Sequence, residues 1–188
     1  MGRRRSSGTL KRVEDMRVII PEQRIAARVQ ELAEAINRDF AGRKLLVLGI
    51  LKGSLIFLAD LVRRLRLPIR YEVVVLSSYK DGTTPGDVDF FGELPAARPD
   101  EEILIVEDII DTGHTLERLR DWLNEQYDRP VSLCVFLNKL GRRDADVAPD
   151  YVGFTLRTRA FVVGYGLDYA EGYRNLPYIA ALEAGETA

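Results

Sequence analysis

Apolar residues recur along the chain in two alternating patterns, continuous short runs and positions at helical spacing. Pro21 suits the first turn of a helix, and Gly42 is placed to end it. Between them, apolar residues on one helical face are Ile25, Val29, Leu32, Ile36 and Phe40. The run at 45–50 is typical of a buried strand, and the apolar-rich segment 55–65 predicts a second helix.

Further apolar runs predict strands at 71–78, 103–106, 131–137, 151–155, 161–165 and 178–182. Three leucines at helical spacing predict another helix, and they are Leu116, Leu119 and Leu123. Because strands alternate with helices, we expect an α/β fold with a parallel central sheet, flanking helices and right-handed crossovers. The sequence contains no internal repeat and no sign of a boundary, so residues 13–188 are expected to form a single domain.

The stretch Ile103–Thr115, with the sequence ILIVEDIIDTGHT, joins one of these runs to a helix. Two adjacent carboxylates, Glu107 and Asp108, follow the aliphatic residues, and Asp111 precedes the segment 112–115. In open α/β sheets ligands bind at the carboxyl ends of strands, and backbone N–H groups at a helix start bind anions. Carboxylates can hold a vicinal diol or a hydrated Mg²⁺. The stretch therefore predicts a site for a phosphorylated sugar, and the alternative is that these residues only cap a turn.

A second strand–turn–helix unit is centred on the sequence LKGS at 51–54. Lys52 and Gly53 suit a second anionic group, and the alternative is an ordinary turn with a solvated lysine. Residues 80–89, KDGTTPGDVD, are polar and rich in turn formers. Long polar loops in compact domains are often lids, so we expect this loop to cover the site.

Composition narrows the class of protein. The 188 residues are 46% hydrophobic and 30% charged with a net charge of −2, which is typical of a globular protein and gives no whole-chain basic character. No apolar run reaches the ~18 residues of a membrane span, and the N-terminus lacks the apolar segment of a signal peptide. We therefore expect a cytoplasmic protein. Cys134 lies in an apolar run, which predicts a buried thiol.

Residues 1–12 contain basic side chains and no acidic one. This composition predicts a flexible basic arm. Contact with nucleic acid and N-myristoylation at Gly2 are the alternatives for this segment.

Five segments in order resemble those of the hypoxanthine-guanine phosphoribosyltransferases, and the resemblance covers nearly the whole chain after residue 12. VEDIIDTGHT at 106–115 is similar to the loop that binds phosphoribosyl pyrophosphate, and 51–54 is similar to the pyrophosphate loop. SSY at 77–79 matches the start of the mobile lid. NKLGRR at 138–143 matches the purine-contact segment, and 161–179 matches the hood and magnesium segment.

The resemblance implies a type I phosphoribosyltransferase fold with a small hood subdomain, built from the N-terminal segment and about residues 156–188. It implies a purine salvage enzyme of the glycosyltransferase class, with Mg²⁺ as cofactor. The reaction would transfer the 5-phosphoribosyl group from phosphoribosyl pyrophosphate to hypoxanthine or guanine, giving IMP or GMP and pyrophosphate. Family members are commonly dimers or tetramers, so the expected partners are small-molecule substrates and further copies of the chain, without nucleic acid or membrane.

The resemblance also implies roles in binding the sugar diphosphate. Glu107 and Asp108 would hold the ribose hydroxyls, partly through Mg²⁺, and Asp168 would reach the pyrophosphate-bound metal. The loop around the 5′-phosphate would consist of Asp111, Thr112, Gly113, His114 and Thr115. The contacts to pyrophosphate would come from Lys52, Gly53, Ser78, Tyr79 and Arg174. In the family the peptide bond before this lysine is often cis.

For the purine, the resemblance gives Asp111 the catalytic role of handling the proton at N7. Lys139 would donate a hydrogen bond to the 6-oxo group, Phe161 would stack on the base and the Val162 backbone would read its edge. Asp168 belongs to the same purine-binding set. Lys139 with Phe161 suits a 6-oxopurine without ranking hypoxanthine, guanine and xanthine.

Three positions depart from the family pattern. His114 stands where the family often has lysine, Ser54 replaces a frequent glycine, and Asn138 precedes Lys139 where bacterial members often have aspartate. These departures bear on affinity and base preference, and the reaction class is unaffected.

Two alternatives stay open at this stage. One is a regulatory protein on the same fold that binds the sugar diphosphate to control nucleic-acid binding, and the other is an enzyme for xanthine or a pyrimidine. Asp111, Lys139 and the lid sequence favour an enzyme. In addition, about 45 residues before the first predicted strand are too few for a typical separate DNA-binding domain.

Overall fold

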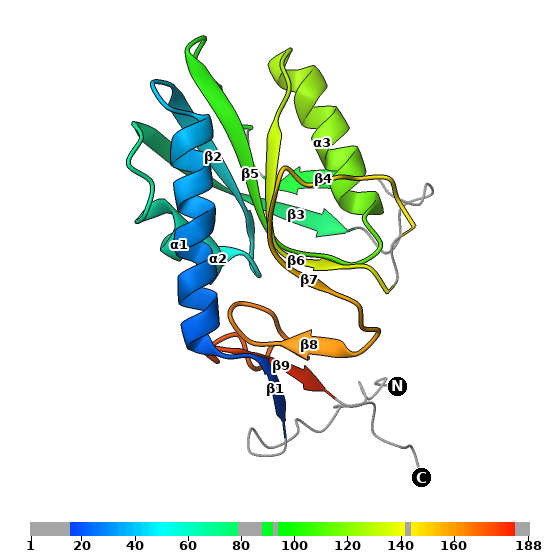
Figure 1. Cartoon of the computed structure of the whole chain (residues 1–188). Coiled ribbons are helices and arrows are strands. Elements are labelled where there is room, and N and C mark those ends of the chain that lie inside the picture. The colour runs from blue at the N-terminus through cyan, green and yellow to red at the C-terminus, as the bar shows by residue number, and fades with distance from the viewer. Residues whose placement is uncertain (1–15, 79–87, 92–93, 142–143, 183–188) are drawn as a thin grey trace, which may run out of the picture.

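The computed structural model of the chain describes residues 16–78, 88–91, 94–141 and 144–182, with the backbone alone at 76–78 and 88–91. Within these ranges the chain forms a large sheet, a small sheet and three helices (Figure 1). The helices are α1 (Glu22–Asp39), α2 (Leu55–Val62) and α3 (His114–Tyr127). The predicted basic arm at 1–12 lies outside the described residues.

The large sheet has the strand order β4-β3-β2-β5-β6-β7. Its strands are β2 (Lys44–Leu51), β3 (Ile69–Ser78), β4 (Val88–Phe91), β5 (Glu101–Ile110), β6 (Ser132–Lys139) and β7 (Tyr151–Leu156). All neighbours pair in parallel except β3 and β4, which are antiparallel. The predicted α/β fold with a parallel sheet is confirmed, and the antiparallel edge strand β4 was not predicted because it adjoins the polar loop.

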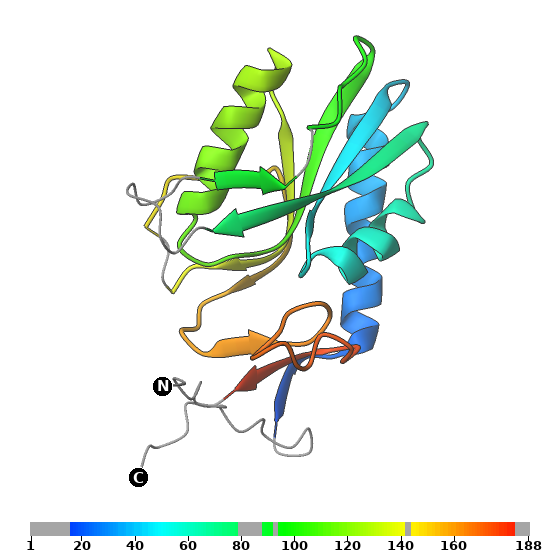
Figure 2. The ribbon, with the colours of Figure 1, turned by 180° about the vertical axis from the view of Figure 1, so that it is seen from behind.

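Helices cover both faces of the large sheet, with α1 and α2 on one side and α3 on the other (Figure 1 and Figure 2). Alternate strand residues supply the two cores: Val47 and Leu104 pack with the α1 side, while Leu48 and Ile105 pack with the α3 side. Strands buried on both faces read as continuous apolar runs, which is why the sequence revealed them. The predicted helical stripes are buried, as is Cys134.

The small sheet joins the two ends of the described chain. It has the order β1-β9-β8, all antiparallel, with β1 (Arg17–Ile20), β8 (Phe161–Val163) and β9 (Ile179–Leu182). It lies beside the N-terminal end of α1, below the large sheet in Figure 1. These are the segments that the resemblance assigned to the hood. Strand β1 was missed. Because the first strand begins at Arg17, the estimate of ~45 residues before the first strand was too large.

Several element boundaries differ from the predicted ones. Strand β5 continues past Val106 to Ile110, because Glu107 pairs with Val135 and the ladder with β6 keeps the backbone extended. The acidic pair therefore lies within the strand, and the turn begins only at Asp111. Helix α2 ends at Val62, three residues before the predicted end.

The strand predicted at 161–165 ends at Val163. Gly164 has a φ of 100° and Tyr165 a φ of 49°, and such positive values cannot continue a strand. The chain turns there towards the large sheet.

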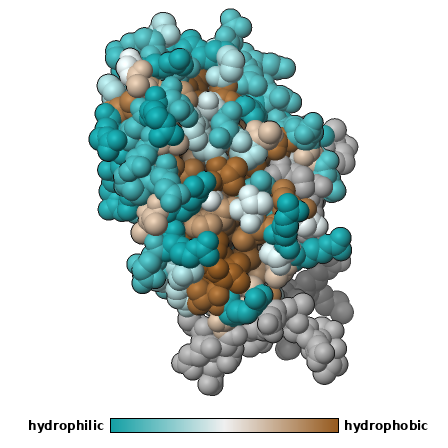
Figure 3. Space-filling view, in the orientation of Figure 1, coloured by the Kyte–Doolittle hydropathy of each residue, from teal (hydrophilic) through white to brown (hydrophobic). Residues whose placement is uncertain are grey.

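Apolar side chains gather in the middle and lower part of the face seen in Figure 3, at the level where the two sheets meet, while the upper part is mostly hydrophilic. In the part of the chain that the structure describes, none of the helices has both the length and the apolar character needed to cross a membrane.

Candidate active site

Neighbouring parallel strands bring three predicted segments to one edge of the large sheet. Strand β5 lies between β2 and β6, and all three end on the same side. The turn after β2 carries Lys52 and Gly53, the turn after β5 begins at Asp111, and β6 ends at Lys139. A loop from the small sheet, residues 164–174, reaches the same edge, as the contacts described next establish.

Gly53 is the point where three segments meet. A Cβ added at Gly53 would lie 1.5 Å from Asp108 Oδ2, and a Cβ added at Gly166 would lie 2.0 Å from the Gly53 carbonyl oxygen. Only glycine allows both approaches. The Leu51–Lys52 peptide bond is cis, as the resemblance implied. Ser54, one of the departures, is buried, and its hydroxyl donates a hydrogen bond to the Ile50 carbonyl within this turn.

The environment of Glu107 and Asp108 disfavours the ionised form of both carboxyls. Burial raises the pKa of the Glu107 carboxyl well above its usual range, and the adjacent Asp108 charge adds to the shift. Burial also raises the pKa of Asp108, although its hydrogen bonds and the positive charge of Arg174 partly oppose the shift. Two neighbouring carboxylates in this environment favour a cation or a hydrogen-bond donor as a partner.

A metal ion at this edge would need ligands from substrate or water in addition to protein side chains. The described residues include no group of three or more histidine, cysteine, aspartate or glutamate side chains that could hold a metal ion by themselves. The predicted metal set of Glu107, Asp108 and Asp168 is therefore not a preassembled cage, and its role stays a prediction. Mg²⁺ sites commonly combine one or two carboxylates with substrate phosphates and water, which is a donor set this edge can complete.

The start of α3 is open to an anion. Gly113, with a φ of 97°, is the N-cap residue, and as a glycine it forms no side-chain cap hydrogen bond. The N–H groups of Leu116 and Glu117 donate to the Gly113 carbonyl at 3.1 and 2.9 Å. By helix geometry, the N–H groups of His114 and Thr115 point beyond the helix end, where an anion binds.

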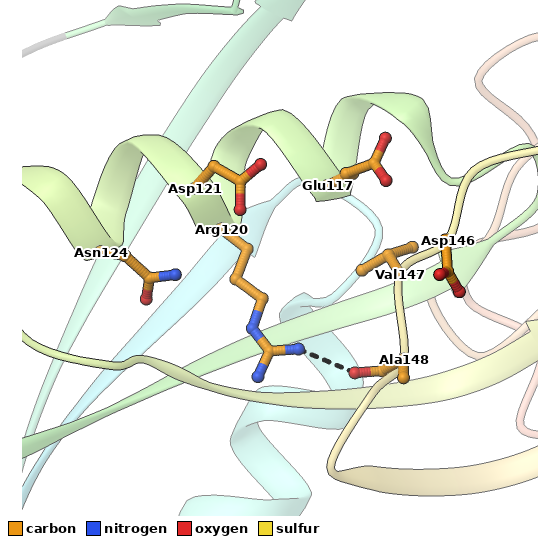
Figure 4. Close-up of a pocket in the computed structure, with 7 residues that line it drawn as sticks. All are labelled: Glu117, Arg120, Asp121, Asn124, Asp146, Val147 and Ala148. Carbon is orange, nitrogen blue, oxygen red and sulfur yellow. Dashed lines mark hydrogen bonds between the residues drawn. The ribbon is translucent and has the colours of Figure 1, made fainter.

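The connection between β6 and β7 holds this turn in place. The Thr112 carbonyl accepts hydrogen bonds from the backbone N–H groups of Asp144 and Ala145, both at 3.1 Å. Further along α3, Arg120 donates to the Ala148 carbonyl at 2.8 Å (Figure 4). A polar pocket of about 290 Å³ lies beside this contact, and none of the predicted site residues lines it.

Asp111 and Lys139, both predicted for the purine, form an ion pair. Lys139 Nζ lies 3.3 Å from Asp111 Oδ1, and Lys139 is only 4% exposed. The contact follows from the ladder, because Ile110 pairs with Asn138 and places the next residue of each strand side by side.

The cationic residues predicted for pyrophosphate meet the loop from the small sheet. Arg174 Nη2 lies 2.7 Å from Asp168 Oδ1, and Arg174 Nη1 donates to the Gly166 carbonyl at 2.8 Å. Lys52 Nζ lies 3.2 Å from Glu171 Oε2. Glu171 was missed from the sequence, although its spacing of three residues from both Asp168 and Arg174 was a signal that could have revealed it.

Phe161 is a large aromatic residue that is 51% exposed at the start of β8. The ring of Tyr169 lies edge-on to it, with centroids 5.5 Å apart and planes at 76°. Val162 is buried, as expected for the opposite face of the strand. Tyr169 is a second residue that sequence reasoning missed. Ser78 ends β3 and pairs with Val88, whereas Tyr79 and most of the predicted lid lie outside the described ranges.

Comparison with known proteins agrees with this geometry. A family model described as the phosphoribosyl transferase domain matches residues 19–170. A hypoxanthine phosphoribosyltransferase of Haemophilus influenzae is 43% identical over 166 residues, which cover 86% of this chain and 92% of the relative. A hypoxanthine-guanine phosphoribosyltransferase of Lactococcus lactis is 41% identical over 168 residues, which cover 89% of this chain and 91% of the relative.

Solved structures are also similar to this chain in fold and sequence. A hypoxanthine-guanine phosphoribosyltransferase from Bacillus anthracis has a TM-score of 0.81 at 38% identity, and the match covers 88% of this chain and 98% of that structure. A hypoxanthine phosphoribosyltransferase from Staphylococcus aureus has a TM-score of 0.83 at 37% identity, with 90% and 93% covered. The resemblance inferred from the sequence is confirmed, and the chain belongs to the hypoxanthine-guanine phosphoribosyltransferases within the phosphoribosyl transferase family.

Proposed function

We propose that this protein is a purine salvage enzyme that transfers the 5-phosphoribosyl group of phosphoribosyl pyrophosphate to hypoxanthine or guanine, giving IMP or GMP and pyrophosphate. The observation that carries the proposal is the convergence, at the carboxyl ends of β2, β5 and β6, of the acidic pair, the start of α3 and the loop 164–174. Tyr169 of this loop contacts the half-exposed ring of Phe161. Membership of the family supports the same reaction. Each part of the site suits one part of the substrates.

The sugar diphosphate is bound along the edge of the sheet. Its 5′-phosphate accepts hydrogen bonds from the N–H groups at the start of α3, within the loop 111–115. Glu107 and Asp108 accept hydrogen bonds from the ribose hydroxyls. Lys52 and Arg174 neutralise charge on the pyrophosphate, which increases as the bond to the anomeric carbon breaks.

We also propose Mg²⁺ as the cofactor. Glu107, Asp108 and Asp168 provide oxygen donors only, which suit Mg²⁺ rather than zinc. Their fit rests on the two adjacent carboxylates of raised pKa, for which a cation is the natural partner. When bound, the ion supplies positive charge to the leaving diphosphate.

The base is bound between the two sheets. Phe161 stacks on the purine and the Val162 backbone contacts its edge. Lys139 donates a hydrogen bond to the 6-oxo oxygen from its buried position at the end of β6. As N9 bonds to the anomeric carbon and pyrophosphate leaves with its electron pair, the purine gives up its N7 proton, and Asp111 accepts it.

We also propose the domain organisation, the lid, the compartment and the oligomeric state of the enzyme. Residues 13–188 act as one domain in which the small sheet serves as the hood, and Ser78 and Tyr79 belong to the lid that excludes water from the reacting sugar. The enzyme acts in the cytoplasm as a homodimer or homotetramer, without nucleic acid as a partner.

A turnover assay with hypoxanthine, guanine, xanthine and adenine, each with and without EDTA, tests the proposal. We expect turnover with the first two bases, none with adenine because it carries a donor at position 6, and loss of turnover in EDTA that Mg²⁺ restores. Binding of phosphoribosyl pyrophosphate without turnover of any base would indicate the regulatory alternative. Full activity in EDTA would exclude the metal.

A further inference from the structure

Glu171 lies between the two cationic side chains proposed to bind pyrophosphate. Its Oε2 atom is 3.2 Å from Lys52 Nζ and 3.8 Å from Arg174 Nη2. A single carboxylate oxygen near two cations is the arrangement that a phosphate oxygen would adopt there.

Hydrogen bonds fix the backbone of the turn that carries Glu171. Tyr169 and Gly172 exchange both backbone hydrogen bonds, at 3.2 and 3.0 Å, around the two-residue turn of Ala170 and Glu171. Both turn residues have positive φ, 51° and 64°, a conformation for which two-residue hairpins favour asparagine and glycine. The Glu171 N–H also donates to Asp168 Oδ2 at 3.0 Å. The chain thus holds a glutamate in a backbone conformation that disfavours it, a kind of strain that clusters at functional sites.

We propose that Glu171 sets the affinity of the pyrophosphate subsite by occupying it. In the free enzyme its carboxylate pairs with Lys52 and lies near Arg174, whose closer partner is Asp168, and a diphosphate must displace it to reach Lys52. The side chain is 70% exposed, so it can move into solvent while the turn stays in place. This inference rests on the proposed function, in which the two cations bind pyrophosphate.

The consequence is weaker binding of both the sugar diphosphate and the product pyrophosphate. An exposed ion pair contributes little, so the effect is modest, about two- to fivefold in each dissociation constant. A carboxylate that returns to the cations as pyrophosphate leaves also favours product release. Glu171 is accordingly an affinity-determining residue rather than a catalytic one.

The test compares Glu171→Gln with wild type and with Glu102→Gln. Glu102 also forms an exposed ion pair, 3.1 Å from Arg43 Nη1, at the opposite end of β5 from the site, so it is a matched control. Calorimetric titration with Mg²⁺-pyrophosphate should show binding about two- to fivefold tighter in Glu171→Gln and unchanged in the control. The KM for phosphoribosyl pyrophosphate should fall by a similar factor, with the KM for hypoxanthine unchanged.

A second variant, Glu171→Gly, keeps the test valid if the first fails to fold, because glycine suits the positive φ and also lacks the carboxylate. It should tighten pyrophosphate binding as well. Equal or weaker binding in a folded variant would overturn the inference, since Glu171 would then position the two cations or act on neither. If wild type binds pyrophosphate and the variants bind it more tightly, but no base is turned over, the inference stands and the proposed function fails.

Discussion

The carboxylate of Asp108 lies directly against the backbone of Gly53, with no space for even a methyl group between them. Asp108 is assigned to the ribose hydroxyls, and Gly53 belongs to the turn assigned to pyrophosphate. The residues proposed for the two halves of the sugar-diphosphate site are therefore in contact before any substrate binds, and a substitution at one displaces the other.

Replacing Gly53 with alanine should displace Asp108, because the new Cβ would lie 1.5 Å from its Oδ2 atom. Misplacement of reacting groups by about 1 Å costs about a hundredfold, so we expect kcat/KM for phosphoribosyl pyrophosphate to fall on that scale. Steady-state kinetics at saturating hypoxanthine measure it. Gly42→Ala is the control: Gly42 also has a positive φ, but a Cβ there would meet nothing within 4 Å, so kinetics should stay near wild type while stability falls. Normal kinetics in the Gly53 variant would mean that Asp108 has room to shift.

Replacing Glu107 with glutamine should stabilise the protein while removing its activity. The raised pKa means that the folded state holds this proton more tightly than the unfolded state. Below the ordinary glutamate pKa both states are protonated and there is no cost. Above it the unfolded chain loses its proton first, so folding becomes less favourable until the pH passes the pKa of the folded state.

The melting temperature of Glu107→Gln should therefore exceed that of wild type at about pH 7.5, and the difference should vanish near about pH 4. Differential scanning calorimetry without Mg²⁺ or substrate measures both. Glu102→Gln, an exposed change on the same strand, should show no such gain. A Glu107 variant that is less stable at neutral pH would show that the charged carboxylate is compensated in the free protein.

Replacing Asp111 with asparagine separates chemistry from binding. Asparagine keeps an acceptor for Lys139 but cannot take the N7 proton, and positioned proton transfer is typically worth ~10²–10⁴-fold. We expect kcat to fall within that range while the affinity for phosphoribosyl pyrophosphate changes little. Stability should also fall, because Lys139 is nearly buried and loses its charged partner. Loss of sugar-diphosphate binding together with kcat would make the role of Asp111 structural.

Replacing His114 with lysine tests whether the first residue of α3 acts on the phosphate. His114 is exposed at the first position of α3, where its positive charge would favour a phosphate. Histidine changes charge between roughly pH 5 and 8, whereas lysine stays charged. His114→Lys should therefore lower the KM for phosphoribosyl pyrophosphate near pH 8 and leave it unchanged near about pH 6. Parallel KM profiles for the two proteins would mean that the side chain does not act on the phosphate.

The large sheet and its helices could be predicted because the sequence signals for them are local. Continuous apolar runs marked its buried strands, and leucines at helical spacing marked the buried face of α3. Asp111 was predicted from the rule that ligands bind at the carboxyl ends of strands, Lys52 from its strand–turn–helix unit, and Lys139 from the resemblance. The roles of individual residues came from the resemblance and stay predictions.

What the sequence did not reveal depends on long-range pairing or on backbone conformation. The strand Arg17–Ile20 is too short for its pattern to be distinctive, and only its pairing with β9 makes it a strand. The position of Glu171 depends on two consecutive positive φ values at residues that rarely adopt them. The contact between Phe161 and Tyr169 requires a turn of the chain that no periodicity encodes.

The pairing of Arg17 with Ala181 has a consequence for the order in which the enzyme becomes functional during translation. All strands of the large sheet lie before residue 157, whereas two of the three strands of the small sheet come after it. Strand β9 comes later, and Phe161 pairs with Leu182. The small sheet, which carries Phe161, is therefore completed only after β9 has been synthesised, later than the strands of the large sheet.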